Sequence, residues 1–300
     1  MPPLLRHSLD YFLRGLLMGG ADIIPGVSGG TIALIVGVYE RLIAAISHLV
    51  SFGLGVVRLD REAALDAWRT VDWRLLLPLG GGIVTALLVG ARFIPGLMEQ
   101  YPMHMQGLFL GLVAASLFIP WQRMARVTLP FVGIAVGAAV AAFFLTGLPQ
   151  LQVSQPGLLR VFGSAAVAIC AMILPGVSGA FLLEVLGIYT PTLEAVNTQQ
   201  WTYIAVFIAG AGAGLGLFSK ILDALLRHYH DATMAALIGL IAGALRALWP
   251  YTTTDGTLQW PTSGDPIGSV LALGLLGFAA VAALVWWGTR RQRQVPSSIT

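Results

Sequence analysis

The sequence predicts an all-α, polytopic membrane protein built from two inverted repeats, each a re-entrant helical hairpin followed by three transmembrane helices. Its apolar composition, its long apolar segments and a Pro-Gly-Val-Ser-Gly motif that occurs twice support this fold class. Of the 300 residues, 57% are hydrophobic and 10% are charged, whereas soluble domains average about 25% charged residues. No soluble fold hides so much apolar surface, so we expect the chain to lie in a lipid bilayer.

Six apolar segments approach the ~20 residues that are needed to cross a hydrocarbon core. They cover about residues 73–91, 105–120, 127–147, 202–219, 233–249 and 267–288. Most of the 36 glycines fall inside apolar segments, which favours close helix packing and broken helices. The single cysteine, Cys170, excludes a disulfide framework, and we interpret it as a small buried hydrophobic residue.

The repeat occurs in two registers. The motif at 25–29 recurs at 175–179, an offset of 150, whereas the apolar segments that begin at Trp73 and Trp201 match with an offset of 128. The chain therefore divides into a first repeat, residues 1–150, and a second repeat, residues 151–300.

The two offsets differ because the first half has a longer connection, roughly residues 47–72. Apolar residues recur at helical spacing among its charges, which predicts an amphipathic helix near 56–71 on the membrane surface. A solvated linker is the alternative.

The distribution of basic residues predicts the orientation, because cytoplasmic loops collect Lys and Arg. If both motif segments are re-entrant, almost all basic residues face the cytoplasm, including the Arg-rich tail at 290–293, and only Arg92, Arg160 and Arg246 lie toward the outside. Three crossings per half is an odd number, so the second half is inverted, as in many transporters. Both termini are then cytoplasmic.

Each motif interrupts a helix with proline and glycine and restarts it near a serine, which suits a helix N-cap. A helix N-terminus offers unpaired backbone N–H groups and a positive dipole end to an anion, especially a phosphate. Two such loops, entering from opposite faces, would outline one central site; packing corners are the alternative. The candidate binding residues are Pro25, Gly26, Ser28, Gly29, Gly30 and Thr31 in the first motif and Pro175, Gly176, Ser178 and Gly179 in the second.

Charged residues near the motifs are further candidates, because ionisable groups in membrane segments are costly and usually functional. Arg14 is a candidate to neutralise a bound phosphate, and Asp22 and Glu184 are candidates to carry a proton. The alternatives are a helix cap or a partner of Arg14 for Asp22, and a buried hydrogen-bonded acid for Glu184. We expect Glu40 and Arg41 to pair at the membrane interface.

The sequence contains no recognisable enzyme, metal or cofactor constellation. Walker, HExxH and nucleotide-binding motifs are absent, and His228 and His230 lack the partners that a metal site needs. We interpret these histidines as interfacial residues. The Arg-rich tail follows an apolar span, so we interpret it as a membrane anchor and not as a nucleic-acid site.

Residues 19–31, continued by 37–42, closely resemble the signature of the bacterial PopT family of polyprenyl-phosphate transporters, long catalogued only as a domain of unknown function. The resemblance covers roughly residues 9–287. It implies a flippase that recycles undecaprenyl phosphate, the lipid carrier of cell-wall precursors, from the outer to the cytoplasmic leaflet of the bacterial inner membrane. It also implies that the motif loops bind the phosphate head, while the roles of Arg14, Asp22 and Glu184 are our inference from the residues.

Two other functions remain as alternatives. Undecaprenyl-pyrophosphate phosphatase resembles this plan and carries a PGxSRS loop, but Gly29 and Gly179 stand here in place of its arginine. Without that arginine, the charge stabilisation that phosphoryl transfer requires is missing, so we expect a protein that is not an enzyme. A channel or exchanger for small anions is the second alternative.

Overall fold

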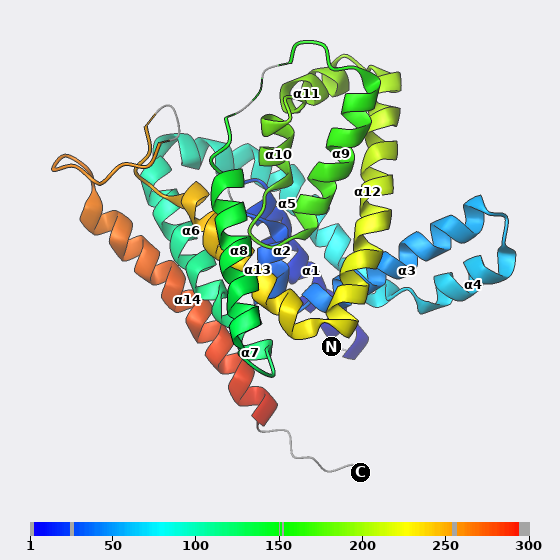
Figure 1. Cartoon of the computed structure of the whole chain (residues 1–300), viewed down its shortest axis with the longest axis horizontal. Helices are drawn as coiled ribbons and strands as arrows, with labels where there is room; N and C mark the ends of the chain where they lie inside the picture. Colours follow the sequence, from blue (N-terminus) through cyan, green and yellow to red (C-terminus); the bar gives the residue numbers. More distant parts are fainter. Residues whose placement is uncertain (1–2, 25–26, 150, 152, 254–256, 294–300) are drawn as a thin grey trace.

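The computed structural model describes residues 3–24, 27–149, 151, 153–253 and 257–293, and these residues are helical apart from loops and one isolated bridge between Thr252 and Leu258 (Figure 1). The first half contains α1 (Pro3–Asp22), α2 (Gly29–Ile35), α3 (Tyr39–Val57), α4 (Arg61–Thr70), α5 (Trp73–Gln100), α6 (Pro102–Ser116), α7 (Phe118–Arg123) and α8 (Leu129–Leu145). The second half contains α9 (Leu158–Ile173), α10 (Gly179–Val185), α11 (Tyr189–Asn197), α12 (Trp201–His228), α13 (His230–Ala244), the 3-10 helix η1 (Leu245–Leu248) and α14 (Ile267–Arg293). The predicted all-α class is confirmed.

The order of helices follows the two registers of the sequence. The short helices α2 and α10 have 7 residues each, and the long helices α5 and α12 have 28 residues each. Helices α6 and α13, which come next, have 15 residues each. Helix α4 lies between the two registers, at the place where the first half has its longer connection. The inverted relation of the two halves stays a prediction.

Among the described residues, six helical segments are long and apolar enough to cross a membrane. They are α3, α5, α6 with α7, α12, α13 with η1, and α14. The sequence predicted five of them; it missed α3, because residues 47–57 continue this helix instead of starting a connection. Helix α8, expected as a full span, has only 17 residues. Helices α10 and α11 are bent by 102° relative to each other, as in a broken or re-entrant segment.

Helix α4 occupies Arg61–Thr70, inside the stretch predicted to be amphipathic. Asp60 caps it by accepting a hydrogen bond from the backbone N–H of Ala63 at 3.0 Å. Trp68 packs its ring against Phe52 of α3 and Trp73 of α5, with centroids 5.0 and 4.3 Å apart. The connection is therefore folded against α3, and its place on the membrane surface stays a prediction.

Four close helix pairs build the body of the protein: α1 with α5, α9 with α12, α6 with α14, and α8 with α13. The last two pairs each join a helix of one half to a helix of the other, so the halves are interleaved. Glycine permits these contacts: a Cβ at Gly239 would overlap the carbonyl oxygen of Ala135 and lie 2.7 Å from the Cβ of Ala138. Close backbone approach is how helices associate where burial of apolar surface gives little driving force.

The molecule has two distinct ends (Figure 1). The start of α1, the end of α14, α7 and the turn between α12 and α13 lie at one end, here called the terminal face. Helix α11 and the start of α9 lie at the opposite end, here called the distal face. Helix α9 runs inward from the distal face and α10 runs back toward it, whereas α1 begins at the terminal face.

We predict that Gly239→Leu destabilises the protein, because the side chain would force α13 away from the backbone of α8. Overpacking of this kind costs about 1–3 kcal/mol. Thermal unfolding of detergent-purified protein should show a lower midpoint, whereas Gly133→Leu, on α8 with no atom within 4 Å of its added Cβ, should unfold like the parent. Equal midpoints for both variants would contradict the proposed close contact.

Candidate functional site

The two motif loops meet between the ends of α1, α2, α9 and α10. Thr31 Oγ1 accepts a hydrogen bond from the backbone N–H of Gly176 at 2.9 Å, and Ser28 Oγ donates to the carbonyl oxygen of Leu174 at 3.3 Å. Both hydroxyl side chains are buried, with exposed fractions of 2% for Ser28 and 0% for Thr31. We call this contact, formed by Asp22, Ser28, Thr31, Leu174 and Gly176, the motif junction.

The first turn of α2 is capped by two side chains of the first motif. Ser28 has the extended backbone of an N-cap, and its Oγ accepts from the N–H of Gly30 at 3.1 Å. Asp22 Oδ1 accepts from the N–H of Gly29 at 2.6 Å. A Cβ at Gly29 would lie 2.5 Å from Asp22 Oδ2, so a side chain there would displace the Asp22 carboxylate. Asp22 is therefore a helix cap, one of the two alternatives for this residue.

The second motif is capped differently. Ser178 Oγ accepts from the N–H of Phe181 at 3.4 Å, and the position that corresponds to Asp22 is Met172. Gly176 has a φ of +86°, and its added Cβ would lie 2.9 Å from the backbone of Ile241. The junction is thus chemically asymmetric, with its carboxylate contributed by the first half alone.

The backbone amides of the junction are bonded within the protein, so the prediction of unpaired amides is wrong. The N–H groups of Gly29, Gly30, Gly176 and Phe181 all point to oxygens of the protein itself. The sequence predicted unpaired amides; the structure differs because buried N–H groups require acceptors, and neighbouring side chains supply them. An anion could reach these amides only by displacing a carboxylate or a hydroxyl. Pro25 and Gly26, also candidates, lie outside the described residues.

Arg14 and Glu184 lie away from the junction. Arg14 lies beside the C-terminal end of α2, and Glu184 lies at the C-terminal end of α10, whereas the junction is at the N-terminal ends of these two helices. Arg14 donates through Nη1 to the carbonyl oxygen of Val36, the C-cap of α2, at 2.5 Å, and pairs with Asp10 at 2.8 Å. Arg14 therefore pairs with Asp10, and not with Asp22. Glu184 lines a hollow of about 520 Å³. The other residues that line it are Leu151, Val153, Ser154, Gly187, Tyr189, Thr190, Pro191 and Glu194.

Arg160, which the sequence placed only on the outer side, has a contact like that of Arg14. Its Nε and Nη2 donate to the carbonyl oxygen of Leu186, the C-cap of α10, at 3.3 and 3.0 Å. The offset of 150 pairs Val36 with Leu186, but it pairs Arg160 with Asp10. Sequence alignment of the repeats therefore hides the equivalence, and the sequence signal is only that an arginine occurs in each of the helices that precede the motifs, α1 and α9.

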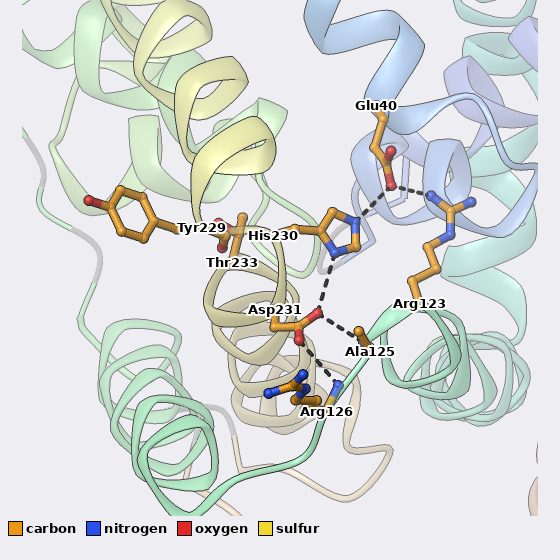
Figure 2. Close-up of polar contacts among 8 residues, drawn as sticks. All are labelled: Glu40, Arg123, Ala125, Arg126, Tyr229, His230, Asp231 and Thr233. Carbon is orange, nitrogen blue, oxygen red and sulfur yellow. Dashed lines mark hydrogen bonds and ion pairs between the residues drawn. The ribbon is translucent and has the colours of Figure 1, made fainter.

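A network of charged side chains joins the start of α3 to the second half near the terminal face (Figure 2). Glu40 pairs with Arg123 at 2.8 Å and with His230 at 3.6 Å, and His230 lies 3.6 Å from Asp231. The expectation that Glu40 and Arg41 pair with each other is wrong, because adjacent helical residues do not face each other. The guanidinium of Arg41 bonds instead to Asp72 and Tyr11.

Asp231 extends this network by accepting hydrogen bonds from the backbone N–H groups of Ala125 and Arg126 at 2.9 and 3.2 Å. Its carboxylate thereby fixes the loop between α7 and α8 against the first turn of α13. In the part of the chain that the structure describes, no group of three metal-ligating side chains occurs. The network joins α3, the end of α7, the loop after it and α13, so it acts as a structural clamp.

Comparison with known proteins identifies the family. Residues 18–265 match the family described as undecaprenyl phosphate translocase-like. The chain belongs to this family. The match contains both motifs, and the names of the family and of its members indicate a transporter and not an enzyme.

Two relatives carry the name polyprenyl-phosphate transporter. The protein from Vibrio cholerae serotype O1 is 38% identical over 261 residues, which cover 86% of this chain and 83% of the relative. The protein from Staphylococcus aureus is 28% identical over 260 residues, which cover 81% of this chain and 87% of the relative. No solved structure matches the chain.

We predict that Thr31→Val weakens the contact between the two halves of the family fold. Valine has the shape of threonine but leaves the buried N–H of Gly176 without its acceptor, which costs about 1–3 kcal/mol. The midpoint of thermal unfolding should fall for Thr31→Val and stay near the parent value for Thr31→Ser, which keeps the hydroxyl. The reverse order would show that the methyl group, and not the hydrogen bond, matters at this position.

Proposed function

We propose that the protein moves undecaprenyl phosphate, or a close polyprenyl-phosphate relative, between the leaflets of the bacterial inner membrane and binds its phosphate head at the motif junction. The observation that carries this proposal is the bond from the Gly29 N–H to the Asp22 carboxylate, 2.6 Å long. It supports an environment that accepts anionic oxygen at the start of α2. The names of the two relatives support the lipid class.

Binding would replace the internal acceptors of the junction by phosphate oxygens. The head group would displace the Asp22 carboxylate from Gly29 and accept hydrogen bonds from the N–H groups of Gly30 and Gly176 in place of Ser28 and Thr31. The hydroxyls of Ser28, Thr31 and Ser178, released from their roles as acceptors, would then donate to the phosphate. A phosphate offers several acceptor oxygens, so one head group can satisfy amides from both motifs at once. The hydrocarbon tail would remain in lipid while the head crosses. Pro25, Gly26, Pro175, Ser178 and Gly179 complete the proposed site as backbone and cap.

The same proposal places the terminal face toward the cytoplasm. Three helices that meet this face, α3, α7 and α12, have an arginine within three residues of the end that lies there, namely Arg41, Arg123 and Arg227 (Figure 1). Basic residues concentrate on the cytoplasmic side of membrane proteins. The proposed direction of recycling is then from the leaflet at the distal face, here called the distal leaflet, to the leaflet at the terminal face, here called the terminal leaflet.

We predict that removing either cap hydroxyl slows lipid transport. In proteoliposomes that contain fluorescent undecaprenyl phosphate, Ser28→Ala and Ser178→Ala should each lower the transport rate about tenfold, the effect of one lost hydrogen bond to a charged head group. Ser51→Ala should have no effect, because the bond that this hydroxyl forms among the described residues is to the Ser47 carbonyl within α3. Unchanged rates in both motif variants would reject the junction as the head-group site. Flux of inorganic phosphate without lipid movement would instead indicate a small-anion pathway.

Asp22 gives a separate test of the displacement step. Asp22→Asn keeps an oxygen acceptor for the Gly29 N–H but removes the negative charge that competes with phosphate. We predict several-fold tighter equilibrium binding of undecaprenyl phosphate to the purified variant, measured by lipid titration. A proton carried by Asp22 would also make transport by the parent, but not by Asp22→Asn, respond to a proton gradient. Weaker binding by the variant would contradict a competing role for the carboxylate.

A further inference from the structure

Two arginines bond to equivalent carbonyl groups in the two halves. Arg14 bonds to Val36 and Arg160 to Leu186, and these acceptors are the C-caps of the two short motif helices. Arg160 is the third residue of α9, which begins at the distal face. Arg14 lies on the terminal side of the junction, where α2 leads into α3.

Each arginine is bordered by apolar side chains that face outward. Next to Arg160 on α9, Leu159 is 87% exposed and Phe162 is 38% exposed. Next to Arg14 on α1, Leu13 and Leu17 are 50% and 58% exposed. In a bilayer, such surfaces contact hydrocarbon, so each guanidinium lies where a phosphate head and its own lipid tail can be in contact with the protein together.

The free bonding capacity of the two guanidinium groups differs. A guanidinium has five N–H donors, and Arg160 directs two nitrogens to a single carbonyl. Among the described residues no carboxylate forms an ion pair with Arg160, whereas Arg14 has Asp10 at 2.8 Å. Arg160 therefore has N–H donors for a phosphate beyond those that bond to Leu186, whereas Arg14 has to exchange Asp10 for it.

We propose that Arg160 and Arg14 are two head-group stations of the transport path, Arg160 receiving the lipid phosphate at the distal face and Arg14 at the terminal face. The inference rests on the proposed function. It adds Arg160 to the residues that bind the phosphate and assigns each arginine to one face of the protein. The hollow beside Gly187 does not suit the phosphate, because Glu184 and Glu194 line it. The counter-ion of Arg14 weakens the terminal station relative to the distal one, which favours capture at the distal face and release at the terminal face.

The test measures half-saturation separately for each leaflet. Proteoliposomes with the protein in one orientation receive fluorescent undecaprenyl phosphate in either the distal or the terminal leaflet, over a range of lipid fractions. The half-saturating fraction is the appropriate readout, because without a driving gradient a passive carrier has the same permeability in both directions.

Arg160→Gln should raise the half-saturating lipid fraction about tenfold in the distal leaflet and leave that of the terminal leaflet within about twofold. Arg14→Gln should do the reverse. Glutamine can still donate to the C-cap carbonyl, and Arg160→Lys, which keeps the charge, should retain most of the distal affinity. Arg92→Gln and Arg227→Gln, which lie outside the two stations, should behave like the parent.

Other outcomes would overturn the proposal. If Arg160→Gln and Arg14→Gln lower the maximal rate equally and leave half-saturation unchanged from both sides, the arginines are only structural caps. If inorganic phosphate competes as strongly as the lipid at the distal face, the station does not recognise a lipid. If the parent protein moves no lipid phosphate at all, the proposed function fails first, and this result is distinct from the loss of side-specific effects.

Discussion

The fold depends on how helix ends inside a bilayer obtain hydrogen-bond partners. Helices α2 and α10 start at the motif junction, where buried N–H groups need acceptors from the protein itself. Asp22, Ser28, Thr31 and Ser178 supply the missing acceptors. Because Thr31 serves a backbone group of the other half, the same requirement that stabilises each loop also holds the two loops together.

Glycine determines how closely the remaining helices approach. The pairs α6 with α14 and α8 with α13 each join a helix of one half to a helix of the other. Backbone contacts such as Gly239 against Ala135 leave no room for a Cβ. Near the terminal face, the network around Glu40 and His230 joins α3 to α13 and to the end of α7. The halves are therefore connected at the junction, along the helix pairs and at the terminal face.

The charged residues near the motifs differ between the two halves, although the order of helices repeats. The first half contributes the carboxylate at the junction, and it also provides the counter-ion of Arg14. The second half has Met172 in place of Asp22 and an arginine without a carboxylate partner among the described residues. A carrier that binds on one side and releases on the other benefits from such a difference, because two identical stations would hold the phosphate equally well.

The sequence by itself determined the all-α membrane class, five of the six long spans, the two registers and the motif residues, because apolar length and repeated Pro-Gly-Val-Ser-Gly segments are local properties. It also indicated the family. The tertiary structure decided that Asp22 caps α2, that Glu40 pairs with Arg123 and His230, and that Arg160 matches Arg14. These contacts join residues from different helices, and their partners depend on the three-dimensional approach of backbones, which no periodicity or spacing in the chain encodes.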